Sequence, residues 1–204
     1  LLKVLFERLR QWDKTTINKV DLYIANSKNV AKRVKTFYNR EAKVLYPPIN
    51  NEFFNKNTIS DLPKEFFLSF GAITPYKRID LLVETFNKNQ KPLVIIGEGS
   101  EKKALMKKAK SNITFKNNLP WKDIEDIFSK SKLLIFPGEE DFGMIPLEVM
   151  AYGIPVLAYK KGGALETVIE DKNNVEQSTG LFFDEQSPES LNNSLEKFSQ
   201  IEHL

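Results

Sequence analysis

The chain has 204 residues, a formal net charge of +3, 41% hydrophobic residues and no cysteine. This length suits one sizeable domain with appended elements, and so small a net charge gives no strong field for nucleic acid. The lack of cysteine excludes a disulfide framework and thiolate metal sites, and it fits a reducing compartment. No apolar run approaches the roughly 20 residues that cross a bilayer. We therefore expect a cytoplasmic protein that contacts membranes at most peripherally, on their inner face.

The first 50 residues predict a helix, a strand, a second helix and a further strand. Apolar residues recur at helical spacing from Leu2 to Trp12, with basic residues between them. We favour a helix packed on a core here, and a basic amphipathic helix at a membrane surface is the alternative. Ser27 can cap the second helix. Because the chain opens at Leu1 inside a helical pattern, we expect a piece of a longer protein, and the polar residues 51–64 indicate a linker.

Short apolar runs alternate with helical patterns over residues 65–204. The runs cover residues 66–70, 93–96, 113–115, 133–136, 155–158 and 181–183. Apolar stripes at helical spacing stand between several of them, as from Ile79 to Phe86. Strands that alternate with helices indicate βαβ units, and right-handed crossovers then give a parallel sheet with helices on both faces. The sequence thus predicts an α/β, Rossmann-like domain over residues 65–204.

Glycines and cations follow the predicted strands, where ligands of such a sheet bind. The glycines of these turns are Gly71, Gly97, Gly99, Gly138, Gly143, Gly162 and Gly163. Since glycine lets a ligand approach the backbone closely, their clustering on one edge indicates a phosphate or sugar site. Lys77 and Arg78 precede a helix expected near Ile79, an arrangement suited to a diphosphate. The alternative is a solvated pair of charges.

Acidic residues surround the predicted start of a helix near Met144. Carboxylates before a helix stabilise it by about 0.3–1 kcal/mol, which is sufficient to explain Glu139 and Asp141. Glu148 lies among apolar neighbours and needs partners, for which two ribose hydroxyls would be suitable donors. The chain has no GxxxxGK[ST] loop, no GxGxxG after its first predicted strand of the domain and no GxSxG turn. The chain therefore lacks the signature residues of Walker-type NTPases, of NAD dehydrogenases and of serine hydrolases that use a GxSxG turn.

Residues 140–156 resemble the signature of family-4 retaining glycosyltransferases, in which two glutamates are separated by seven residues. Seven residues separate Glu140 from Glu148 here. Supporting segments occur in the family's order at residues 25–27, 44–48, 71–77, 94–99, 162–166 and 179–183. The resemblance covers nearly the whole chain and is to the C-terminal half of a GT-B glycosyltransferase. It implies that residues 1–50 are the remnant of an N-terminal domain and that residues 65–204 bind a nucleotide sugar.

The resemblance also implies roles for single residues. Glu148 would hold the donor ribose, Glu140 would contact hydroxyls of the transferred sugar, and Lys77 would bind phosphate, with Glu140 and Lys77 as the catalytic pair. The remaining donor contacts would come from Gly71, Arg78, Gly97, Gly99, Phe142, Gly143, Met144 and Ile145, with the base near the backbone of Phe115 and Lys116. One departure is Ala72, which stands where the family often has an arginine, and Arg78 is the residue expected to compensate.

Residues 76–78, 139–143 and 162–168 look most like bacterial mannosyltransferases of O-antigen and polysaccharide assembly. The implied function is transfer of a hexosyl group, mannosyl from GDP-mannose, with retained configuration to a glycan or lipid-linked acceptor. We expect no cofactor, no metal and no nucleic acid partner. A UDP-sugar-dependent transferase of the same fold and a non-catalytic nucleotide-sugar-binding module are the alternatives. Since the family's N-terminal domain holds the acceptor, the isolated chain is expected to bind donor without transferring sugar.

Overall fold

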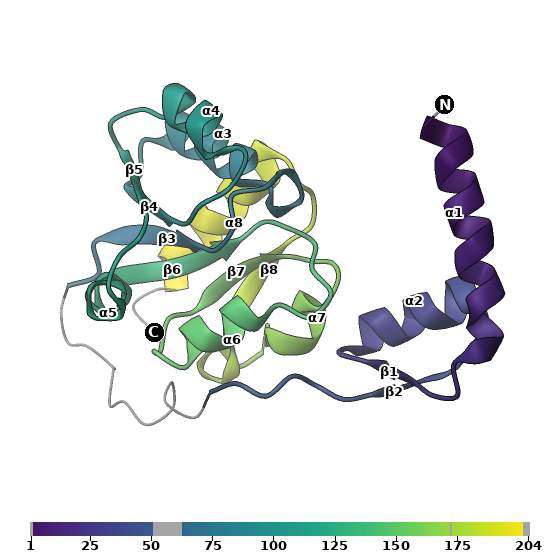
Figure 1. The fold of residues 1–204 in the computed structure, drawn as a ribbon. Coiled ribbons are helices and arrows are strands. Elements are labelled where there is room, and N and C mark those ends of the chain that lie inside the picture. Colours follow the sequence, from purple (N-terminus) through teal and green to yellow (C-terminus); the bar gives the residue numbers. More distant parts are fainter. Residues whose placement is uncertain (1, 51–62, 172, 202–204) are drawn as a thin grey trace. The chain divides into compact units, whose positions relative to one another are not determined.

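The computed structural model describes residues 2–50, 63–171 and 173–201, and the chain divides into two compact units, Leu1–Pro48 and Ile49–Leu204 (Figure 1). The linker expected over residues 51–64 lies almost wholly outside the described residues. We describe each unit by itself.

The N-terminal unit contains two helices and two short parallel strands. Its elements are α1 (Leu2–Thr16), the 3-10 turn η1 (Ile17–Lys19), β1 (Tyr23–Ala25), α2 (Lys28–Tyr38) and β2 (Ala42–Val44). The predicted cap of α2 is confirmed, since Ser27 Oγ accepts a hydrogen bond from the Val30 amide at 3.0 Å. Tyr38 Oη donates to Asp13 Oδ2 at 2.7 Å and links the two helices. The order helix, strand, helix, strand is as the sequence predicts.

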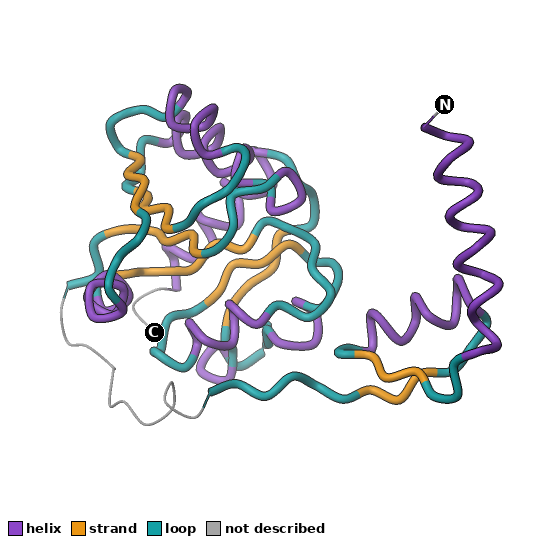
Figure 2. The backbone as a smooth tube through the Cα atoms, in the orientation of Figure 1, coloured by secondary structure: helices purple, strands orange, loops and turns teal. Residues whose placement is uncertain are grey.

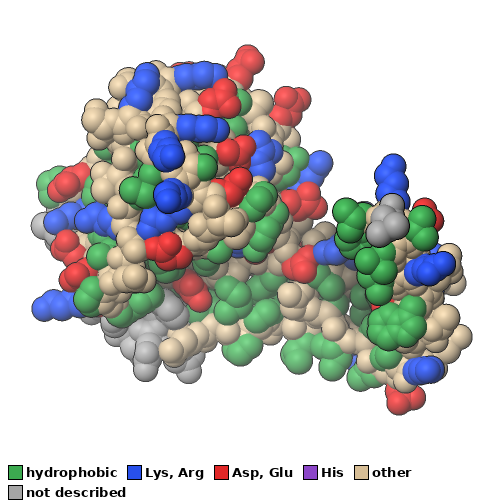
Figure 3. Space-filling view, turned by 45° about the horizontal axis from the view of Figure 1, so that its top comes forward, with side chains coloured by type: hydrophobic (Ala, Val, Ile, Leu, Met, Phe, Trp, Pro, Cys, Tyr) green, Lys and Arg blue, Asp and Glu red, His purple; other side chains and the backbone are tan. Residues whose placement is uncertain are grey.

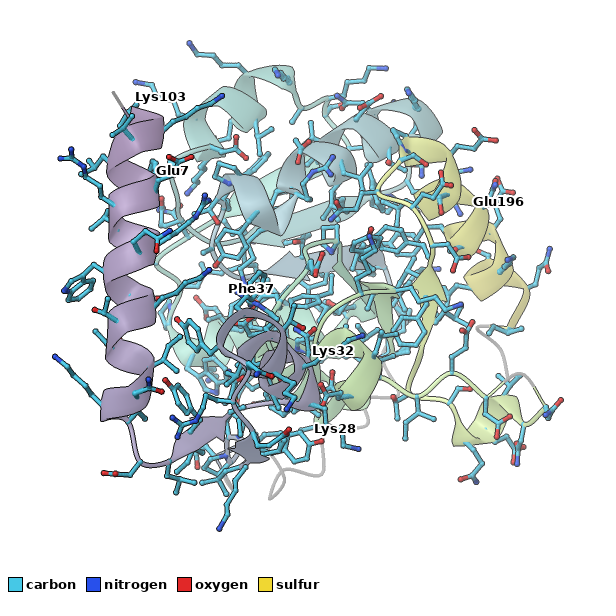
Figure 4. The ribbon with its side chains drawn as sticks, turned by 90° about the vertical axis from the view of Figure 1, so that its right-hand side faces the viewer. Glu7, Lys28, Lys32, Phe37, Lys103 and Glu196 are labelled. Carbon is cyan, nitrogen blue, oxygen red and sulfur yellow. The ribbon has the colours of Figure 1, made fainter. Side chains whose placement is uncertain are left out.

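The expectation that the first helix packs on a core is wrong for this unit. Helix α1 has no buried residue, and Leu5, Leu9 and Trp12 are 53%, 49% and 66% exposed. Figure 3 shows hydrophobic side chains at the surface of this unit. On α2, the exposed Phe37 accompanies Lys28 and Lys32 (Figure 4). The physical reason is size, because two strands of three residues each offer no apolar face broad enough to cover a helix of 15 residues.

The C-terminal unit is built on a six-stranded parallel sheet of order β5-β4-β3-β6-β7-β8 (Figure 2). The strands are β3 (Phe66–Phe70), β4 (Leu93–Ile96), β5 (Ile113–Lys116), β6 (Ser131–Phe136), β7 (Val156–Tyr159) and β8 (Gly180–Phe183). All the pairings are parallel, for example Leu68 with Leu134, and the β3–β6 register shifts between Phe66 and Phe67. This confirms the predicted α/β, Rossmann-like class.

Helices cover both faces of this sheet (Figure 1). One face carries α3 (Ile79–Asn89), α4 (Lys102–Lys108) and α8 (Pro188–Ile201). The other carries α5 (Trp121–Ser129), α6 (Met144–Met150) and α7 (Ala164–Thr167). Successive strand residues point to opposite faces, so Leu133 joins the first core cluster and Leu134 the second. Burial of each such side chain contributes about 1.5–3 kcal/mol to the stability of the fold. The two core layers therefore fix the positions of the strand ends that carry the site.

Candidate functional site

The middle of the sheet contains the point at which its strand order reverses. From β3 the chain continues outward through β4 to β5, whereas β6, on the other side of β3, continues through β7 to β8. Ligands of such sheets bind beyond the carboxyl ends of the strands at this point. The two loops that leave β3 and β6 there carry Lys77 and Glu140. The topology therefore places both expected catalytic residues at the position where this fold binds ligands.

Lys77 and Glu140 form an ion pair between these two loops. Their side chains are only 13% and 18% exposed, so the pair is largely shielded from water. The Lys77 ammonium also lies 5.3 Å from the ring centre of Tyr76 and 5.7 Å from that of Phe136. Burial lowers the pKa of Lys77 below its ordinary value, because desolvation disfavours the charged form. The lysine is thus a partly dehydrated cation whose counter-charge is Glu140.

Glycines let the loops of the site touch one another. A Cβ on Gly138 would lie 2.9 Å from the Tyr76 carbonyl oxygen, so the loops after β3 and β6 are in direct contact. Gly163 donates its amide to the Glu140 carbonyl at 2.7 Å, and a Cβ there would lie 2.3 Å from the Phe142 Cα. A Cβ on Gly97 would meet the Gly71 carbonyl oxygen at 1.8 Å. Because glycine has no side chain, these positions allow the protein's own loops to approach one another closely. A contact of Gly71, Gly97 or Gly99 with a ligand stays a prediction.

Glu148 lies on α6, on the helix face that meets the turn after β3. Ile145, one turn earlier, approaches Gly71 so closely that a Cβ there would be 2.7 Å from Ile145 Cδ1. Residues three apart on a helix share a face, so Glu148 lies on the side of α6 that faces this turn. It is half-buried, and burial raises the pKa of its carboxyl group. A carboxylate in that position gains from a ligand that donates hydrogen bonds to it.

The other expected donor residues lie along the same edge of the sheet. Gly143 precedes α6, Met144 and Ile145 form its first turn, and Phe142 is buried before them. Phe115 lies near the end of β5, where the Lys116 carbonyl accepts the Gly97 amide at 3.0 Å. Their roles toward a ligand remain predictions.

Arg78 differs from Lys77 in that its guanidinium is held by other side chains. It donates to Asp80 Oδ1 at 3.1 Å and to Gln186 Oε1 at 3.0 Å. Ala72, on the loop that precedes Arg78, is exposed. Gln186 follows β8 and was not singled out from the sequence. No pattern could have found it, because a glutamine in a polar turn carries no signal until the fold brings that turn within hydrogen-bonding distance of the loops after β3 and β6.

Among residues 2–50, 63–171 and 173–201, no group of three or more His, Cys, Asp or Glu side chains could hold a metal ion. Within the same ranges, no helix has both the length and the apolar character needed to cross a membrane.

Comparison with known proteins places the chain in a family. Residues 50–204 match the family described as glycosyl transferases group 1. An uncharacterised glycosyltransferase of Methanocaldococcus jannaschii is 27% identical over 96% of this chain and 54% of its own length. The O-antigen chain mannosyltransferase C of Escherichia coli is 25% identical over 75% of this chain and 45% of its own length. The chain thus spans about half the length of these relatives.

Solved structures agree on the fold. The Anabaena protein HepE in complex with UDP and glucose superposes with a TM-score of 0.71, at 20% sequence identity, over 91% of this chain and 57% of HepE. At this identity the likeness concerns the fold alone, which is that of the GT-B glycosyltransferases. With the family match over residues 50–204, it identifies this chain as a member of the group 1 glycosyl transferases.

Proposed function

We propose that the protein transfers a hexosyl group from a nucleoside diphosphate sugar to a glycan or lipid-linked acceptor with retained configuration, and that this chain binds the donor. The observation that carries the proposal is the Lys77–Glu140 ion pair at the strand-order reversal. The Lys77 cation suits the anionic diphosphate of a nucleotide sugar, and the neighbouring Glu140 carboxylate can accept hydrogen bonds from the hydroxyl groups of its sugar. Family membership supports the same reaction class.

Each charged group of the site has one task in this proposal. Lys77, in a partly dehydrated position, stabilises the negative charge that develops on the departing diphosphate. The positive charge of Arg78 beside it strengthens the local potential. Glu140 accepts hydrogen bonds from hydroxyls of the transferred sugar, and Glu148 accepts them from the ribose. Since the transition state has oxocarbenium character, Glu140 orients the sugar, and we assign it no covalent role.

Mannose is the sugar, and GDP the nucleotide, that we propose. The support is the likeness of residues 76–78, 139–143 and 162–168 to mannosyltransferases, together with the relative named as an O-antigen chain mannosyltransferase. The UDP bound by HepE does not weigh against GDP, because a likeness at 20% identity carries the fold and no specificity. A UDP-sugar donor is the rival that the experiment below distinguishes.

The acceptor is proposed to lie on an N-terminal domain that is not part of this chain. The relatives are about twice as long as the region they share with it. In the N-terminal unit, Leu5, Leu9 and Trp12 on α1 and Ile24 on β1 are exposed. Apolar surface of this extent is typical of an interface, and we propose that the N-terminal domain covers it. Peripheral membrane contact through the same basic and apolar helix is the alternative.

A thermal-shift titration tests the nucleotide. Purified chain is heated with GDP, UDP, ADP or inorganic diphosphate at matched concentrations, and the melting of the C-terminal unit is recorded. A ligand at 100 times its Kd stabilises by about 2.7 kcal/mol, which raises the melting temperature by several degrees. We expect the largest rise with GDP. A clear preference for UDP would replace the proposed base, and no rise with any of the four compounds would contradict donor binding itself.

A further inference from the structure

We propose that Gln186 is a positioning residue for the donor site, which fixes the turn bearing Lys77 against the loop bearing Glu140. Gln186 lies in the turn between β8 and α8, outside both loops. Its side chain bonds to Arg78, which follows Lys77, and to Pro137, which lies three residues before Glu140, so it acts through these two neighbours. Its effect on ligand affinity rests on the proposed function, whereas its effect on the backbone does not.

The side-chain amide of Gln186 joins two loops at once. Its Nε2 donates to the carbonyl oxygen of Pro137 at 2.8 Å, and its Oε1 accepts from Arg78 Nη1 at 3.0 Å. Pro137 opens the loop that leads to Glu140, and Arg78 directly follows Lys77. The amide therefore bridges the same two loops that the Lys77–Glu140 ion pair joins, through hydrogen bonds that use neither side chain of that pair.

Arg78 needs such support because of its backbone. It has φ 56° and ψ 37°, the left-handed region that a residue with a side chain rarely adopts. This conformation ends the turn Pro75–Lys77, in which the Lys77 amide donates to the Thr74 carbonyl at 3.0 Å and the Arg78 amide to the Pro75 carbonyl at 3.2 Å. Asp80 holds the guanidinium from one side at 3.1 Å, and Gln186 holds it from the other. The direction in which Lys77 points thus depends on an arginine that is anchored at both sides.

Glutamine has the chemistry that this position requires. A side-chain amide offers a donor and an acceptor on one carbon, whereas a carboxylate offers acceptors alone and a thioether almost no polar bond. Gln186→Glu would keep the bond from Arg78 and lose the bond to the Pro137 carbonyl. Gln186→Met keeps the length of the side chain and loses both bonds. The two variants therefore remove one and two of the hydrogen bonds, respectively. The matched control is Gln177→Met, at an exposed position of the 3-10 turn Val175–Gln177.

Amide hydrogen exchange measured residue by residue tests the positioning without any ligand. In Gln186→Met, we expect the amides of Lys77 and Arg78 to exchange about tenfold faster, because lost hydrogen bonds free a strained turn to open locally. The amide of Leu93, the first residue of β4, bonds to the Asn112 carbonyl just before β5 and should keep its rate. Gln177→Met should change none of the three rates. Unchanged rates at Lys77 and Arg78, or an equal acceleration that includes Leu93, would overturn the proposal.

A double-mutant cycle tests the link to the ligand. Gln186→Met should weaken GDP binding about tenfold in the wild-type background and less than about twofold in a Lys77→Ala background, because a residue that acts through Lys77 has nothing left to position. An equal loss in both backgrounds would mean that Gln186 acts independently of Lys77 and would overturn the proposal. If the wild-type chain binds no nucleoside diphosphate, the proposed function fails, and the exchange experiment still decides on Gln186.

Discussion

The ammonium of Lys77 and the carboxylate of Glu140 meet between the loops that leave the two central strands of the sheet. Each is largely buried, and each is the other's counter-charge. A donor that binds here has to separate or bridge this pair, since a diphosphate competes with the glutamate for the lysine. The released carboxylate is then available to hydroxyl groups of the sugar. We propose that the pair in this way links binding of the phosphate end of a donor to binding of its sugar end.

Breaking this ion pair from one side should destabilise the C-terminal unit. Lys77→Met leaves the buried Glu140 carboxylate without its counter-charge, at a cost of about 1–3 kcal/mol. Adding Glu140→Gln should recover most of that loss, because the uncompensated charge is then gone. Urea denaturation in a Trp12→Phe background, with Trp121 as the reporter, measures both. Lys88→Met, which breaks an exposed ion pair with Glu84, serves as the control and should change stability little. A double variant no more stable than Lys77→Met would count against the pairing.

Glu148→Ala should weaken nucleotide binding by about 1.5–3 kcal/mol, the range for a hydrogen bond to a charged group. The reason is its half-buried position on the face of α6 that meets the turn after β3. Calorimetry with GDP measures the loss, and circular dichroism checks that the variant is folded. Glu189→Ala, an exposed glutamate on α8, is the control and should bind as the wild type does. Unchanged affinity in folded Glu148→Ala would remove the proposed ribose contact.

The raised pKa of Glu148 makes the stability of the C-terminal unit depend on pH. The folded value lies above the ordinary 4.5, so the neutral carboxyl group is favoured by folding. Its contribution to stability is complete below pH 4.5 and is lost as pH rises through the folded pKa. Glu148→Gln should therefore be more stable than the wild type at neutral pH, and this difference should vanish in acid.

Binding should follow the opposite trend. A carboxylate accepts ribose hydrogen bonds more strongly than a neutral carboxyl group, so GDP affinity should fall as pH drops through the folded pKa of Glu148. The phosphates of GDP titrate as well, and comparison of wild type with Glu148→Gln at each pH removes that contribution. A constant affinity ratio between the two proteins, from neutral pH down to pH 4.5, would show that Glu148 does not titrate in contact with the ligand.

The strands of the C-terminal unit were predictable, and the contacts across them were not. Strands Phe66–Phe70 and Leu93–Ile96 have the predicted limits because buried parallel strands are continuous apolar runs. The half-burial of Glu148 likewise follows from its apolar neighbours. The ion pair between Lys77 and Glu140 depends on β3 and β6 being adjacent, which no local pattern encodes.

Two other features depend on tertiary surroundings. The amphipathic pattern of α1 predicts that its apolar face is covered, but the rest of its unit has too little apolar surface to cover it. The glycines after the strands looked like openings for a ligand, whereas Gly97, Gly138 and Gly163 make room for neighbouring protein backbone. In both cases the sequence indicates that a close contact exists and leaves its partner undetermined.

The chain alone should bind donor and transfer no sugar. Alignment of two reactants lowers a barrier by about 7–11 kcal/mol, and we propose that the acceptor is aligned by an N-terminal domain outside this chain. Incubation with radiolabelled GDP-mannose and lipid-linked or oligosaccharide acceptors should give no labelled product above a Lys77→Ala control. Sustained transfer by the purified chain would place the acceptor site within residues 1–204 and contradict this division of tasks.

Calorimetric titration of GDP into the wild type, Lys77→Ala and Lys88→Ala tests the proposed donor site most directly. Both variants remove one lysine, but only Lys77 lies at the point where the strand order reverses. We predict that Lys77→Ala binds GDP about ten- to a hundredfold more weakly than the wild type, the equivalent of about 1.5–3 kcal/mol, and that Lys88→Ala binds it equally well. Equal affinity of folded Lys77→Ala and wild type would contradict the placement of the diphosphate at Lys77.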